Sequence, residues 1–234
     1  MATKVESTKP DFSERLTEVL SRNRTIIVVL SVVVVVGIIA TLAVFQIQEN
    51  RAEAGARAIE LVEDEFERWS GLAPDDSARE TTAEAIRQQI VSVQSDYPRS
   101  YGELRSWHIL ALLEWELERY AESAAAFLMI PERFPESHLV AIALSGAASA
   151  TEMAGNTGHA QELLERIVAG EGGPTVERGR ALFNLGRLAE AEGNATRALQ
   201  HYRELEEQFP RGNWTNLARN RIIQLTIDGV STDT

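Results

Sequence analysis

The stretch ALFNLGRLAEAEGNATRALQHYRELEEQFP, residues 181–210, decides the fold of this chain. Apolar and small residues alternate at helical spacing on either side of the break Gly193-Asn194. Pro210 ends the second half, because proline lacks an amide hydrogen and disfavours helical geometry in the residue before it. The stretch therefore predicts two helices, 181–192 and 195–208, whose apolar stripes face each other.

Similar punctuation recurs upstream at a period of about 37 residues. The marks are Tyr97-Pro98, Phe134-Pro135, Gly172-Gly173-Pro174 and Phe209-Pro210. Self-similarity at this period is typical of stacked helix pairs, in which each repeat buries its apolar face against its neighbours. We therefore predict an all-α fold in which helix pairs form a solenoid.

The order of small, aromatic and proline residues resembles the tetratricopeptide repeat family. In the last repeat the matching residues are Leu185-Gly186, Gly193, Ala198, Tyr202 and Pro210. In the first full repeat they are Trp107, Leu110, Ala111, Phe127 and Pro135, with Ser123 where alanine is usual. The middle repeat keeps the small and apolar positions, but glycines replace its closing aromatic and proline.

The resemblance implies three tetratricopeptide-like repeats over 101–212. An irregular helical repeat or cap over 47–100 would precede them. A capping helix over 213–228 would cover the last apolar face, as solenoids require. Residues 229–234 would form a disordered tail.

An apolar run without any charged residue, residues 26–45, precedes the repeats. As a helix it would be about 30 Å long at about 1.5 Å per residue, which matches the hydrocarbon core of a bilayer. In lipid the backbone hydrogen bonds must be satisfied within the segment, so even its β-branched valines are expected to be helical. We predict a single N-terminal transmembrane helix over 25–46.

The orientation of this anchor follows from its basic flank. Arg22 and Arg24 lie at its N-terminal edge, and positive flanks stay cytoplasmic. We therefore expect a cytoplasmic tail over 1–24 and an extracytoplasmic repeat domain. One alternative is a cleaved signal peptide with a weak site at Thr41-Leu42-Ala43, although the run exceeds the 7 to 15 residues usual for such a core. Another is a buried core element.

Composition narrows the class of protein. The 234 residues carry a formal net charge of -12, so a nucleic-acid partner, which needs a clustered basic surface, is not expected. Cysteine is absent, which removes disulfides, thiolate metal sites and a cysteine nucleophile. Within the acidic surplus, Glu63, Asp64, Glu65 and Glu67 form a cluster that we expect on a solvated helix face.

Motifs for chemistry are missing from the sequence. His108, His138, His159 and His201 show no metal-ligand spacing, and there is no nucleophile elbow, Walker loop or dinucleotide fingerprint. We therefore expect neither an enzyme nor a cofactor, a metal or a small-molecule substrate. A hydrolase or metalloprotein with its site in the groove is the alternative class, and bound zinc or iron in purified protein would reveal it.

The resemblance also implies a partner-binding groove lined by the first helix of each pair. The positions that match the family's groove residues mix aromatic side chains with arginines, as interaction hot spots do. They are Arg105, His108, Leu112, Trp115 and Glu116, then Glu152 and Met153, then Arg180, Phe183, Arg187 and Glu190. The alternative for Trp115 and Phe183 is an ordinary core position.

A short tail, one anchor and repeats beyond it resemble the YfgM-type ancillary subunits of the bacterial SecYEG translocon. This implies a single-pass protein of the bacterial inner membrane with a periplasmic C-terminal domain. It also implies protein partners, namely translocon subunits and periplasmic chaperones.

A second resemblance is to periplasmic repeat proteins of envelope assembly, the outer-membrane assembly lipoprotein and the Tol-Pal coordinator. It rests on Tyr97-Pro98-Arg99-Ser100 and Phe134-Pro135-Glu136-Ser137. The lack of a lipobox cysteine counts against the lipoprotein version.

Overall fold

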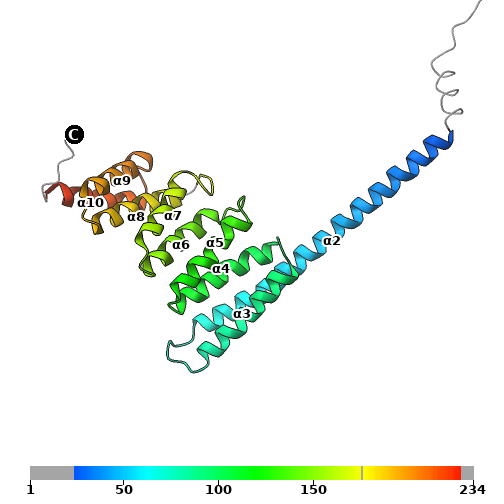
Figure 1. The fold of residues 1–234 in the computed structure, drawn as a ribbon, viewed down its shortest axis with the longest axis horizontal. Coiled ribbons are helices and arrows are strands. Elements are labelled where there is room, and N and C mark those ends of the chain that lie inside the picture. Colours follow the sequence, from blue (N-terminus) through cyan, green and yellow to red (C-terminus); the bar gives the residue numbers. More distant parts are fainter. Residues whose placement is uncertain (1–23, 175, 228–234) are drawn as a thin grey trace, which may run out of the picture. The chain divides into compact units, whose positions relative to one another are not determined.

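The computed structural model describes residues 24–174 and 176–227. Residues 1–23 of the predicted cytoplasmic tail, residue 228 of the predicted capping helix and the predicted tail 229–234 therefore lie outside the described residues. Every regular element in the described residues is a helix, and the all-α prediction is confirmed for them (Figure 1). The elements are α2 (Arg24–Ser70), α3 (Arg79–Asp96), α4 (Tyr101–Glu116), α5 (Tyr120–Arg133), α6 (Val140–Met153), α7 (Thr157–Val168), α8 (Glu177–Ala191), α9 (Ala195–Gln208) and α10 (Asn213–Ile227).

The chain divides into two compact units, Met1–Arg51 and Ala52–Thr234. In the first unit, α2 carries the apolar run, and the large side chains that the structure describes there are exposed, from 53% at Val35 to 67% at Phe45. A core helix would bury them, which argues against the core alternative. By length and composition this helix can cross a membrane. α2 is also longer than the predicted anchor, because it continues without a break to Ser70.

In the second unit the helices follow one another as pairs: the C-terminal part of α2 with α3, then α4 with α5, α6 with α7, α8 with α9, and α10 last (Figure 1). Local sequence sets several helix starts. The side chains of Ser100, Asn156 and Asn194 each accept a hydrogen bond from the backbone N–H three residues ahead, which satisfies a free donor of the first turn. Gly193 turns the chain between α8 and α9 with φ of 75°, a left-handed geometry that glycine adopts readily.

Buried side chains form three hydrophobic clusters along this unit. The first joins α2, α3 and α4 around Ile59, Ile86 and Leu113. The second, the largest, runs from α4 to α8 and includes Leu144 and Leu163. The third joins α8, α9 and α10. Each pair therefore buries its apolar face against its neighbours, as expected of a solenoid.

Glycines allow close packing of neighbouring helices at two crossings, one against backbone and one against an aromatic ring. A Cβ atom on Gly102 of α4 would lie 2.5 Å from the carbonyl oxygen of Gly55 in α2. A Cβ atom on Gly186 of α8 would lie 2.4 Å from Cε1 of Tyr202 in α9. At Gly186 the neighbouring atoms belong to the ring of Tyr202, which is buried.

Candidate protein-binding surface

Arginine–glutamate ion pairs join α2 to α4, α6 to α8 and α8 to α10. The first-helix face is our name for the surface that carries these pairs. It lies on α2 beyond residue 52, α4, α6, α8 and α10. The pairs are Arg105 Nε to Glu63 Oε1 at 2.7 Å, Arg187 Nη1 to Glu152 Oε1 at 2.7 Å, and Arg221 Nε to Glu190 Oε1 at 3.0 Å.

Two arginines of the predicted groove take part in these ion pairs. Arg105 and Arg187 were expected to meet a partner, yet both are engaged within the chain. Of the acidic cluster expected on a solvated helix face, Asp64 and Glu67 are exposed, whereas Glu63 is partly exposed and paired with Arg105. Arg180 lies 3.5 Å from Glu177, one turn earlier in α8.

The α4 part of the first-helix face is a mixture of apolar and polar groups. His108 packs edge-on against Phe127, with ring centroids 5.8 Å apart, and burial together with the nearby Arg105 lowers its pKa to about 4. His108 is therefore neutral near pH 7. Trp115 is half-buried and packs edge-on against Tyr120 at 5.3 Å. Leu112 is exposed.

The remaining predicted groove residues differ in exposure. Met153 is exposed by 55%. Glu116 is exposed and lies 3.9 Å from the guanidinium of Arg79. Phe183 is half-buried, with its ring centroid 5.7 Å from that of Tyr202 and 5.3 Å from that of Trp214. Phe183 thus packs against the third hydrophobic cluster and is also partly exposed at the surface. It combines the groove position and the core position that the sequence left as alternatives.

A pocket of about 460 Å³ opens where α8, α9 and α10 meet. It is lined by Phe183, Arg187, Glu190, Ala191, Tyr202 and Arg221. The structure therefore brings together three of the predicted groove residues. Tyr202 and Arg221 were missed, because the sequence assigned the first to the core and the second to a capping helix.

Glu190 is the electrostatic centre of this pocket. Its carboxylate accepts a hydrogen bond from Tyr202 Oη at 2.6 Å and is paired with Arg221. Burial alone would raise the pKa of Glu190, but the hydrogen bonds from Arg221 and Tyr202 outweigh it, and the pKa is lowered. Burial, with the Glu190 carboxylate, raises the pKa of Tyr202. The pocket therefore holds a fixed carboxylate beside aromatic rings at neutral pH.

Two exposed apolar residues of the first-helix face were not predicted. Ile142 is 42% exposed on α6, and Leu217 is 48% exposed on α10. Helical spacing could have found both, because Ile142 lies eleven residues, about three turns, before the predicted groove residue Met153, and Leu217 lies four residues before Arg221. With Leu112 they place exposed apolar side chains on α4, α6 and α10.

The described residues hold no group of three or more histidine, aspartate or glutamate side chains arranged to bind a metal ion. Instead, the first-helix face carries exposed apolar side chains between compensated charges. Such a surface is suited to binding another protein.

Comparison with known proteins agrees with this reading of the fold. Residues 180–211, which include α9 and most of α8, match the family model described as tetratricopeptide repeat. The chain is similar to a TPR repeat-containing protein of Treponema pallidum (strain Nichols), with 34% identity over 116 residues. The match covers 50% of this chain and 46% of that relative, so the chain spans about half the length of the curated relative it matches. Tetratricopeptide repeats suggest a protein–protein interaction scaffold.

Proposed function

We propose that this protein is a membrane-anchored scaffold that binds partner proteins on its first-helix face, outside the cytoplasm. The observation that carries the proposal is the pattern of that face. Leu112, Ile142 and Leu217 stay exposed on it, while arginine–glutamate pairs fix the helices around them. Rigid apolar contacts surrounded by compensated charge favour a protein segment as ligand.

The compensated charges also indicate how such a face selects its ligand. Because Arg105, Arg187 and Arg221 each have a glutamate partner, an acidic ligand would have to compete for them. Apolar side chains of a ligand meet no such competition. We therefore expect binding to depend more on apolar contacts than on charge, and to be only weakly sensitive to salt.

The anchor supplies the second part of the proposal. We assign 1–24 to a cytoplasmic tail, 25–46 to the membrane helix, 47–100 to a helical cap, 101–212 to three repeats, 213–228 to a capping helix and 229–234 to a tail. Confinement to a membrane raises the effective concentration of neighbouring membrane partners, so modest affinity suffices. The architecture favours the bacterial inner membrane, with translocon subunits and periplasmic chaperones as partners.

In-membrane photocrosslinking tests this proposal. A photoreactive residue replaces Leu112 or Leu217 in the full chain, and a matched control replaces Ala125, which is exposed on α5, a second helix of its pair. We expect translocon or chaperone adducts from the first two sites and none from Ala125. Equal adducts from all three sites would contradict a specific first-helix face. Protease digestion of intact and opened membrane vesicles tests the orientation, since the repeat domain should be protected from the cytoplasmic side.

The second candidate function is an adaptor of envelope or outer-membrane assembly, of the Tol-Pal type. It is favoured by the helix ends at Tyr97-Pro98 and Phe134-Pro135, each followed by a polar turn before the next first helix. The same crosslinking experiment separates the two candidates, because adducts with Pal or with barrel-assembly proteins would support the second.

A further inference from the structure

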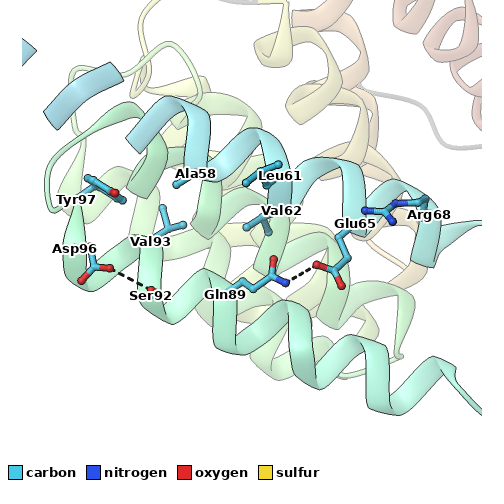
Figure 2. A pocket seen from close by; sticks show the side chains of 10 residues that line it. All are labelled: Ala58, Leu61, Val62, Glu65, Arg68, Gln89, Ser92, Val93, Asp96 and Tyr97. Atoms are coloured by element: carbon cyan, nitrogen blue, oxygen red, sulfur yellow. Dashed lines mark hydrogen bonds between the residues drawn. The ribbon is translucent and has the colours of Figure 1, made fainter. Parts of the chain in front are cut away.

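A second groove lies between α2 and α3, in the first helix pair (Figure 2). Its volume is about 430 Å³. Val62 and Val93, both buried, form its floor, and Leu61 is 68% exposed at its side. None of the residues that line it belongs to the predicted partner-binding set. Glu63, the α2 residue of the first-helix face, lies by helical periodicity on another side of α2, so the groove is a surface apart from that face.

The spacing of the lining residues fits a helix as occupant. Ala58, Leu61, Glu65 and Arg68 recur on α2 at intervals of three and four residues, and Gln89, Ser92 and Asp96 do so on α3. Side chains at this spacing form one ridge along α2 and another along α3. A third helix can insert its own ridge of side chains into the groove between them. The lined part of α2 spans three turns, about 15 Å at 1.5 Å per residue, so the occupant needs a helix of about ten residues or more.

The charge around the groove favours a basic occupant. Residues 52–98 contain eleven acidic and four basic side chains, which gives -7 of the chain's net charge of -12. Within the groove, Glu65 accepts a hydrogen bond from Gln89 Nε2 at 2.5 Å and Asp96 accepts one from Ser92 Oγ at 3.2 Å. These partners are neutral, and among the described residues neither carboxylate forms an ion pair within 4.0 Å. Arg68 is the single basic residue of the lining.

We propose that this groove docks a basic amphipathic helix of a partner protein, with its apolar side chains against Leu61, Val62 and Val93 and its lysines or arginines toward Glu65 and Asp96. A second copy of the chain is disfavoured, because two surfaces of -7 would face each other. An anionic membrane surface is disfavoured by the same sign of charge.

The test uses the full chain in detergent and a labelled helical peptide of leucine and lysine, about 18 residues long and with one apolar face. Fluorescence anisotropy measures its affinity. We expect Leu61→Ser to weaken binding about tenfold, since it removes an apolar contact from the groove. The matched control is Val91→Ser, because Val91 is 57% exposed on α3 but does not line the groove, and it should leave the affinity unchanged.

A second pair of variants tests the electrostatic part. Glu65→Gln combined with Asp96→Asn should weaken binding several-fold and reduce its dependence on salt. A matched peptide of leucine and glutamate should bind at least tenfold more weakly than the lysine peptide. A benzophenone in the lysine peptide should crosslink to 58–68 or 89–97.

Several outcomes would overturn the proposal. Equal effects of Leu61→Ser and Val91→Ser would show that the acidic protein attracts any cationic peptide. Equal affinity for the glutamate peptide would remove the role of charge. Self-association that depends on Leu61 would make a second copy the occupant, and Leu61-dependent binding to anionic vesicles would make it a membrane.

Discussion

Arg187 of α8 donates hydrogen bonds to both carboxylate oxygens of Glu152 in α6, at 2.7 and 2.5 Å. This two-point contact joins the first helices of two successive repeats. It fixes the positions of both helices, because the planar guanidinium and the carboxylate match in only a narrow range of orientations. The pair thus belongs to the scaffold of the first-helix face.

We expect a double-mutant cycle of Arg187→Ala and Glu152→Ala to give a coupling free energy of about 0.5 to 1 kcal/mol, because the geometry is good but both side chains are partly exposed. Urea unfolding of the full chain in detergent, followed by circular dichroism, measures it. The control is the exposed pair Arg57–Glu53, 3.5 Å apart within α2, whose coupling should be about 0.3 kcal/mol. Equal coupling in both cycles would contradict a special role for the inter-repeat pair.

Gly186→Ala should destabilise the protein by about 1 to 3 kcal/mol, although alanine is the better helix former. The added methyl group would lie 2.4 Å from the ring of Tyr202, which is buried and hydrogen-bonded to Glu190 and so cannot move aside cheaply. Gly158→Ala on α7 is the control, because no atom lies within 4 Å of its Cβ position. Thermal unfolding should show a lower midpoint for the first variant and an unchanged or higher one for the second.

Stability should fall as the pH drops from about 6.5 toward 4 because of His108. Its pKa is lowered from 6.5 to about 4 by burial and by Arg105, so the folded state binds fewer protons than the unfolded state in this window. The contribution is fully present above pH 6.5 and is lost as the pH approaches 4, by about 3 kcal/mol. His108→Gln should lose less stability than the wild type over the same window in urea unfolding. An NMR titration that placed the pKa of His108 near 6.5 would remove the basis of this prediction.

Val35→Arg should weaken membrane insertion, because an arginine near the middle of a spanning helix costs about 2.5 to 3.5 kcal/mol. After alkaline carbonate extraction of membranes, the wild type should stay in the pellet and the variant should be partly released. Val91→Arg, on α3, should behave as the wild type. The mass of the purified protein distinguishes the anchor from a cleaved signal peptide, which would leave a chain that begins after about Ala43.

The helix pairs follow from local patterns in the sequence. Apolar residues at helical spacing, the break at Gly193-Asn194 and the stop at Pro210 are visible without coordinates. So is the anchor candidate, since length and the absence of charge are properties of a single segment. Gly186 could be assigned to a close contact because a glycine within a helix needs a packing reason.

Such local patterns could not predict the contacts between repeats. Arg105 and Glu63 are 42 residues apart, and Arg187 and Glu152 are 35 residues apart. Sequence resemblance could assign these arginines to a groove, but it could not show that each already has a carboxylate partner. The pocket that adds Tyr202 and Arg221 to Glu190 also depends on three helices that meet in space.

The sequence by itself determined that this chain forms paired helices behind a segment able to span a membrane, because helical periodicity and hydrophobic length are encoded over neighbouring residues. Only the tertiary structure decided which charges remain available to a partner. Stacking places residues of successive repeats within hydrogen-bond distance, and that distance depends on how the helices cross. The same stacking left Leu61 exposed beside Glu65 in the first pair, where no described helix covers it.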